Sequence, residues 1–280
     1  AEPNAELRAA LARDFSVAVH ADNADAARAA DIAVLAVKPQ VMKTVCAGLR
    51  DVAQARKPLI VSIAAGIRIG QIDAWLGGNL ASVRCMPNTP ALIGAGATGA
   101  CANARVNAAR RALAQDILAA AGLVAWLEDE AQIDTVTAIS GSGPAYFFLL
   151  TEALIEAAVA QGLPREAAQN LATQTCLGAG RMLREDGAAP AELRRRVTSP
   201  NGTTQAALES FAADDFAALP QPGSVYDAAY SRPGNKPMPT LRFVMGDTIR
   251  GLPYANYDSI DWRAPDKPGA SPAIFSSSIG

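Results

Sequence analysis

The sequence contains one histidine, His20, and only four cysteines, which lie far apart along its 280 residues. Cys46, Cys85, Cys101 and Cys176 form no C-x-x-C pair. The sequence therefore offers too few cysteine and histidine ligands for a zinc site, and we expect no bound metal. We expect the thiols to act as small buried hydrophobic residues in a reducing compartment.

An excess of charge of either sign is also absent. The chain has 25 basic and 27 acidic side chains, so it lacks the positive charge that is typical of nucleic-acid binding, and small molecules are the expected partners. The arginines at 194–196 are expected to form a solvated or ion-paired helix face. No signal-like segment opens the chain, and no uninterrupted apolar run reaches the ~18 residues of a membrane span. These absences predict a cytoplasmic protein with no membrane partner.

Half of the residues are hydrophobic, so the chain can bury a sizeable core. Short apolar runs predict strands at 31–37, 58–64, 81–86 and 123–129, with helical patterns between them. These runs are continuous rather than alternating, which is typical of strands that are buried on both faces. Residues 1–128 are therefore predicted to be an α/β domain with a Rossmann-like, doubly wound parallel sheet.

Residues 129–217 have the pattern of successive helices. PAYFFLLTEALIEAAVAQGL, which begins at Pro144, and the helix that follows it are long, alanine-rich and apolar on most sides. Such helices are buried in a bundle or at a subunit interface, so we expect an α-helical dimerisation domain. Residues 218–280 are dense in proline and glycine, and they predict an irregular, partly disordered C-terminal tail.

Two short stretches carry candidate site chemistry. SPNGTT (199–204) precedes a helix, where free backbone N–H groups and hydroxyls favour a bound anion. A capped helix start is the more common reason for these residues, because Ser, Thr, Asn and Gly cap helices in general. SGSGP (140–144) is either a domain hinge, with Ser142 capping the next helix and Pro144 in its first turn, or a functional loop.

Five segments in order resemble the signature segments of pyrroline-5-carboxylate reductase. They are AVKPQ (36–40), SIAAGI (62–67), RCMPNTP (84–90), TAISGSGPAYFF (137–148) and RRRVTSPNGTT (194–204). The resemblance covers residues 1–217. It implies reduction of 1-pyrroline-5-carboxylate to L-proline, the last step of proline biosynthesis, by hydride transfer from NADPH, or from NADH, in a homodimer or a larger homo-oligomer.

The resemblance also implies roles for individual residues. Thr204 would contact the ring nitrogen of the substrate and act in catalysis together with Ser199. Because His20 lies far from these residues in the sequence, the nitrogen is expected to take its proton from solvent or through Thr204. The remaining roles are substrate binding by Gly202, Thr203, Ser142 and Gly143, and cofactor binding by Asn23, Ala36, Val37, Lys38, Ala64, Ala65, Gly66, Met86, Pro87 and Asn88.

The opening of the chain departs from the family pattern. Residues 1–4 read as the end of a strand that leads into a helix, with no earlier strand and G-x-G-x-x-G turn. That unit would supply the donors for the cofactor pyrophosphate and a central strand, so we expect an incomplete sheet with exposed strand edges. We expect the chain to be a fragment, or a frame-shifted or fused reading, of a working enzyme.

Three interpretations of function stay open from the sequence. The first is an active reductase, and the second is an inactive remnant that keeps only the helical interaction surface. The third is a β-hydroxyacid-type dehydrogenase. We rank the third last because the sequence lacks a candidate catalytic lysine after a glycine-rich helix start, whereas VTSPNGTT is present.

Overall fold

The computed structural model describes residues 1–214 and residue 216. The chain divides into two units, Ala1–Cys176 and Leu177–Gly280. The domain boundaries expected after residues 128 and 217 stay predictions, and the expected irregular tail, 218–280, lies outside the described residues.

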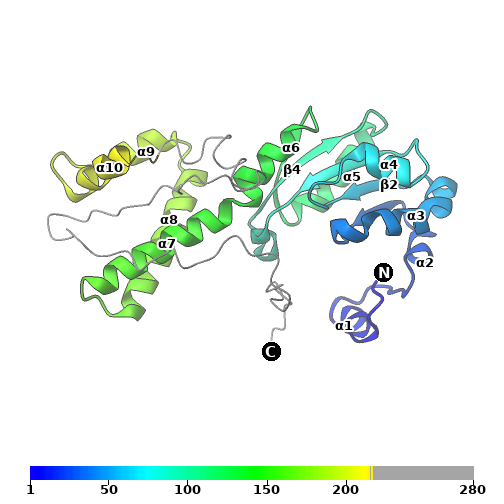
Figure 1. Ribbon diagram of the computed structural model, residues 1–280, viewed down its shortest axis with the longest axis horizontal. Helices are drawn as coiled ribbons and strands as arrows, with labels where there is room; N and C mark the ends of the chain where they lie inside the picture. Colours follow the sequence, from blue (N-terminus) through cyan, green and yellow to red (C-terminus); the bar gives the residue numbers. More distant parts are fainter. Residues whose placement is uncertain (215, 217–280) are drawn as a thin grey trace, which may run out of the picture. The chain divides into compact units, whose positions relative to one another are not determined.

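A five-stranded sheet forms the centre of the first unit (Figure 1). Its strands lie side by side in chain order: β1 (Ile32–Leu35), β2 (Leu59–Ser62), β3 (Ser82–Met86), β4 (Gly96–Ala102) and β5 (Gly122–Leu127). The pairs β1–β2, β2–β3 and β4–β5 are parallel, and β3–β4 is antiparallel. The predicted Rossmann-like α/β fold is confirmed, although the sheet is mixed rather than wholly parallel.

Strand β4 was not predicted from the sequence. Its residues, GATGACA, are small and lack the branched and aromatic side chains that favour strands. The strand is nevertheless almost wholly buried, because glycine and alanine let neighbouring elements approach closely. A Cβ atom on Gly99, for example, would lie 2.7 Å from Cγ1 of Val136.

Helices cover both faces of the sheet, as consecutive residues of β2 show. Ile60 belongs to a buried cluster with α3 (Pro39–Arg56) and α4 (Ile69–Trp75). Val61 belongs to a second cluster, with α5 (Ala108–Ala119). Since side chains alternate across a strand, these two clusters lie on opposite faces. The continuous apolar run of β2 is thus explained by burial on both sides.

Strand β1 is less buried than its sequence predicted. It pairs with β2 at the edge of the sheet, and Val34 is 48% exposed. The expectation that this strand is buried on both faces was wrong, because Val34 belongs to neither buried cluster. Within the described part of the chain, β1 has a neighbouring strand along only one edge. The exposed strand edge that the sequence predicted is present. Before β1 come two short helices, α1 (Ala5–Phe15) and α2 (Asn23–Ala27).

Val34 and Val61 are direct neighbours in the β1–β2 register, yet Val61 is fully buried. Val61→Ala is expected to lower the free energy of unfolding by about 2 kcal/mol, since buried methyl groups are lost. Val34→Ala is the matched control and is expected to change it by about 0.5 kcal/mol or less. Urea denaturation of both variants measures the difference, and equal losses would contradict the assigned burial.

Beyond β5 the first unit becomes helical. α6 (Gln132–Val136) continues into a π-helical turn, η2 (Thr137–Gly141), and then into α7 (Gly143–Ala160). The stretch Gln132–Ala160 is long and apolar enough to cross a membrane by length and composition, and 6% of its most apolar window is buried. One such stretch is weak evidence for a span, because a helix that packs against another chain has the same composition.

The helical pattern of the sequence continues to residue 213. α8 (Arg165–Glu185) runs across the boundary between the units, and α9 (Pro190–Arg196) and α10 (Thr203–Ala213) belong to the second unit. All four helices predicted from Pro144 onward are present. The basic residues at the end of α9 are ion-paired as expected, with Arg195 and Arg196 both bonded to Glu192. These bonds lower the pKa of Glu192 below its ordinary value.

Candidate functional site

Three of the predicted cofactor-binding segments lie at one edge of the sheet. They follow the carboxyl ends of three adjacent parallel strands. The register aligns these ends, since Leu35 pairs with Ser62, and Ser62 pairs with Arg84. In open α/β sheets, ligands bind at this edge. The segments are Ala36, Val37 and Lys38 after β1, Ala64, Ala65 and Gly66 after β2, and Met86, Pro87 and Asn88 at the end of β3.

The turn after β2 presents its backbone outward. Gly66 has φ +73°, a left-handed conformation that glycine adopts without strain. A Cβ atom on Gly66 would meet no other atom within 4 Å, so a ligand can approach this backbone closely. Ala65 and Gly66 are exposed, whereas Ala64 is buried and its N–H donates to Ser62 Oγ at 3.3 Å.

The turn after β1 is formed by the start of α3. Lys38 is the N-cap residue of that helix and is exposed, and Pro39 occupies its first turn, as predicted. Asn23, the remaining predicted cofactor residue, is exposed at the first position of α2. Because Asn23 does not follow a strand of the sheet, its position is not explained by the edge that gathers the three segments.

Asn88 joins two of the signature segments. Its Nδ2 donates to the backbone oxygen of Ser140 at 3.0 Å, and its Oδ1 accepts from the Ala97 N–H at 2.8 Å. Met86 reaches the same segment, because a Cβ atom on Gly141 would lie 2.9 Å from Met86 Cε. The strand end at 86–88 and the SGSG segment therefore lie against each other.

The SGSG segment contains a π-helical turn rather than a simple hinge. Ser140 and Gly141 end η2, Ser142 has αR dihedrals, and Gly143 is buried at the start of α7. Ser142 makes no side-chain cap bond to α7, so the capping alternative was wrong. Single π-helical turns inside helices are frequent at functional sites.

In the second unit, the stretch 199–204 forms an uncapped helix start. Gly202 is the N-cap residue of α10, and no side chain caps this helix among the described residues. The Ala206 N–H donates the first i to i−4 hydrogen bond of the helix, to the Gly202 oxygen. The N–H groups of Thr203 and Thr204 come before this residue and therefore have no acceptor within the helix. The interpretation of this stretch as a side-chain-capped start was wrong.

The backbone before α10 is shaped into a tight turn. Asn201 has φ +58°, and its N–H donates to Gln205 Oε1 at 2.9 Å. The Gly202 N–H donates to the Ser199 oxygen at 3.0 Å. Ser199 and Thr203 are exposed, and Thr204 is half-buried. The free N–H groups carry the positive end of the helix dipole, which favours an anion such as a carboxylate.

Cys46 and Cys85 are poor nucleophiles. Cys46, Cys85 and Cys101 are buried free thiols, as expected, whereas Cys176 is half-buried. Burial raises the pKa of Cys46 to about 11 and that of Cys85 to about 12. Within the described residues, no group of three or more His, Cys, Asp or Glu side chains is arranged to hold a metal ion.

At pH 8 the thiolate forms of Cys46 and Cys85 are scarce, because both raised pKa values lie far above that pH. A thiol-specific alkylating reagent is therefore expected to leave both residues unmodified in the native protein. It is expected to modify them in about 8 M urea, in which most domains are unfolded. Peptide mass spectrometry reads the modified positions. Rapid native labelling of Cys85 would contradict this expectation.

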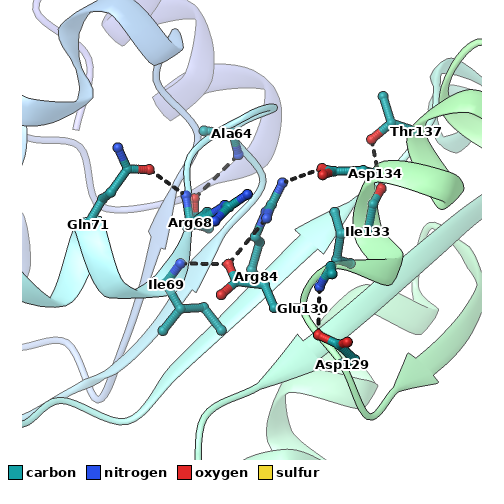
Figure 2. Close-up of polar contacts among 12 residues, drawn as sticks. Ala64, Arg68, Ile69, Gln71, Arg84, Asp129, Glu130, Ile133, Asp134 and Thr137 are labelled. Carbon is teal, nitrogen blue, oxygen red and sulfur yellow. Dashed lines mark hydrogen bonds and ion pairs between the residues drawn. The ribbon is translucent and has the colours of Figure 1, made fainter. Parts of the chain in front are cut away.

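Sequence reasoning missed a buried ion network beside these segments. Arg84 lies in the middle of the sheet and contacts Glu130 and Asp134 (Figure 2). A charged residue within an otherwise apolar strand was the available signal, since buried arginines require partners.

The sequence also contains one G-x-G-x-x-G pattern at 94–99. It leads into strand β4 rather than into a helix, so it lacks the context of a dinucleotide fingerprint.

The fold and the turns at the carboxyl edge of the sheet define the class of dinucleotide-dependent oxidoreductases. Residues 1–66 match the family model "NADP oxidoreductase coenzyme F420-dependent", and residues 130–231 match "Pyrroline-5-carboxylate reductase dimerisation". The chain belongs to the pyrroline-5-carboxylate reductase family. The second match extends past residue 217, so the resemblance covers more of the chain than the expected residues 1–217.

Curated and solved relatives agree with this assignment. A pyrroline-5-carboxylate reductase from Pseudomonas aeruginosa is 56% identical over 220 residues, which cover 78% of this chain and 80% of that protein. A solved structure of the enzyme from Coxiella burnetii is 41% identical, with a TM-score of 0.77, and covers 81% of this chain and 84% of that one. A structure of the pyrroline carboxylate reductase from Plasmodium falciparum with NADP bound is 33% identical, with a TM-score of 0.68. The match covers 77% of this chain and 80% of that one.

Proposed function

We propose that this protein reduces 1-pyrroline-5-carboxylate to L-proline with NADPH as the hydride donor, as a cytoplasmic homodimer or larger homo-oligomer. Membership of the reductase family supports the reaction. The observation that carries the proposal is the alignment of three signature turns at one sheet edge, with Asn88 bonded to the SGSG segment. NADH is the second candidate donor.

The residues at the sheet edge fit a nicotinamide dinucleotide. The left-handed backbone at Gly66 leaves an open surface, and the turns after β1 and β3 flank it. When bound, the cofactor supplies a hydride from C4 of its nicotinamide ring. Residues 64–66 would support that ring, residues 86–88 would extend along it, and residues 36–38 and Asn23 would hold the remainder of the cofactor.

In the second unit, the start of α10 is proposed to bind the substrate carboxylate. The free N–H groups of Thr203 and Thr204 would donate to its oxygens, with the Ser199 hydroxyl adding a further bond. Gly202, whose own N–H donates to the Ser199 oxygen, would allow the carboxylate to approach this backbone. In the first unit, Ser142 and Gly143 are proposed to border the substrate. Backbone donors favour the charged carboxylate form, which fixes the orientation of the ring.

Reduction of a cyclic imine also needs a proton on the ring nitrogen. Thr204 is the proposed contact to that atom, because a hydroxyl can both donate and accept a hydrogen bond. The ring nitrogen would take its proton from solvent or through the Thr204 hydroxyl. The chain's single histidine, His20, is not proposed as the acid, because it is exposed and lies before the first strand. An imine whose nitrogen is protonated in this way accepts a hydride more readily at its ring carbon.

The inactive-remnant alternative is not favoured. The chain covers 80% of the P. aeruginosa reductase and retains the signature turns in register. The dehydrogenase alternative is less favoured still, because the matched dimerisation model and the curated relatives are those of the reductase. The dimerisation model over 130–231 and the exposed aromatic residues of α7, which include Phe147 and Phe148, support assembly with a second copy.

Steady-state kinetics of the purified chain test the reaction. NADPH oxidation is followed by its absorbance, with 1-pyrroline-5-carboxylate as substrate and L-proline measured as product. Isothermal titration with NADPH and with NADH determines cofactor binding and preference. Absence of both cofactor binding and substrate-dependent oxidation would restore the remnant alternative.

A further inference from the structure

Arg84 is a buried charge in the interior of the sheet. It lies on β3 between Ser62 of β2 and Cys101 of β4, and only 3% of the residue is exposed. A guanidinium cannot lose its proton in a protein, so burial imposes a large desolvation cost unless partners compensate for it. An apolar residue at this position would fill the strand without this cost.

Two carboxylates from outside the sheet compensate for this charge. Arg84 Nη1 donates to Glu130 Oε1 at 3.2 Å, and Nη2 lies 3.5 Å from Asp134 Oδ1. Figure 2 shows the guanidinium group between the two acidic side chains. The Nε atom is buried and has no hydrogen-bond partner among the described residues. The orientation of the guanidinium group is thus set by its two outer nitrogens.

Each carboxylate leads to a different part of the proposed site. Glu130 Oε1 also accepts from the Ile69 N–H at 2.7 Å, and Ile69 begins α4 directly after the turn that contains Gly66. Asp134 lies in α6, which continues without interruption into the π-helical turn that ends at Gly141. One buried cation therefore connects the turn after β2 with the helix that leads to the SGSG segment.

We propose that Arg84 is a positioning residue for the reductase reaction. Through Glu130 and Asp134, it holds the cofactor turn after β2 and the substrate-bordering segment after α6 against the same strand. This inference rests on the proposed function, because it assumes that these two segments act on one reaction. Arg84 itself would touch neither the substrate nor the cofactor.

The energetics favour a positioning role over a stabilising one. Buried ion pairs often contribute little net stability, because desolvation offsets the attraction between the charges. Geometry is more sensitive, since a displacement of about 1 Å far from the chemistry can reduce the rate about 100-fold. Only arginine presents two separate donors in a rigid plane, so lysine cannot hold both carboxylates in the same arrangement.

The test compares Arg84→Lys and Glu130→Gln with the unmodified protein. Arg84→Lys keeps the charge but loses the planar pair of donors, and we expect kcat/KM for 1-pyrroline-5-carboxylate to fall about 10- to 100-fold. NADPH affinity, measured by titration, is expected to weaken about 10-fold because the turn after β2 is displaced. Glu130→Gln keeps an oxygen acceptor for the Ile69 N–H, so a smaller loss of about 3- to 10-fold is expected.

Val83→Ala is the matched control for a purely structural role. Val83 lies next to Arg84 on β3, is 1% exposed, and belongs to the cluster on the opposite face. This variant is expected to melt earlier and, below its melting temperature, to keep the kcat/KM and NADPH affinity of the unmodified protein. If Arg84→Lys and Glu130→Gln behave like Val83→Ala, Arg84 is structural and the proposal is overturned.

The same measurements separate this inference from the proposed function. An unmodified protein that binds NADPH but does not turn over substrate would overturn the reaction. The NADPH affinities of the variants would still decide whether Arg84 positions the cofactor turn. Normal turnover with unaltered kinetics in both variants would overturn the positioning role and leave the reductase assignment intact.

Discussion

Thr204→Ala is expected to lower kcat/KM for 1-pyrroline-5-carboxylate about 100-fold, the range measured when a positioned proton-transfer group is removed. The physical reason is the proposed contact between the Thr204 hydroxyl and the ring nitrogen. That contact is stronger once the nitrogen gains its proton, so its loss acts on kcat as well as on binding. Alanine keeps the backbone N–H that is proposed to bind the carboxylate.

Stability is expected to change little in the same variant. Removing a true capping hydroxyl costs about 0.5–2 kcal/mol, but no side chain caps α10 among the described residues. Thr198→Ala is the control, because its hydroxyl donates to the Arg194 oxygen at 2.7 Å and has no proposed role in the reaction. Kinetics and melting temperatures are measured for both variants. Full kcat/KM with earlier melting in Thr204→Ala would show that the residue has only a structural role.

Gly122→Ala is expected to destabilise the first unit by about 3–5 kcal/mol, at the upper end of single substitutions. Gly122 has φ +139°, and a Cβ atom there would lie 2.1 Å from the Gly96 oxygen and 2.5 Å from the Gly96 nitrogen. Both of these atoms are backbone atoms of the paired strand, so no side-chain rotation can relieve the clash. The β4–β5 pairing begins at this position, where the Gly96 N–H donates to the Ala121 oxygen.

Gly48→Ala is the matched substitution. Gly48 lies inside α3, and a Cβ atom there would meet nothing within 4 Å. Alanine is the better helix former, so this variant is expected to gain about 0.5–1 kcal/mol. Urea denaturation measures both free energies of unfolding. A Gly122→Ala variant as stable as the unmodified protein would contradict the β4–β5 register.

Strands with continuous apolar runs could be predicted from the sequence, whereas β4 could not. Residues 58–64 predict a buried strand, because isoleucine, leucine and valine favour the pleated, covered surface on which they are found. The glycine and alanine residues of β4 have no such preference. Tertiary packing, such as the contact of Gly99 with Val136, determines its conformation.

Of the candidate site, too, only the parts that depend on local sequence could be predicted. The helix start at Thr203 could be predicted, because it follows from local sequence alone, and its anion-binding role stays a prediction. The network of Arg84 could not, since Glu130 follows 46 residues later in the chain and its approach depends on the packing of α6 against β3 and β4. The hydrogen bond between Asn88 and Ser140, 52 residues apart, has the same origin.

The most direct test of the reductase assignment is a coupled measurement of NADPH oxidation and L-proline formation by the purified chain. We expect substrate-dependent oxidation, with one L-proline formed for each NADPH consumed, and NADPH binding that is tight enough to detect by titration. Absence of both cofactor binding and L-proline formation, in protein whose melting curve shows a cooperative fold, would contradict the assignment.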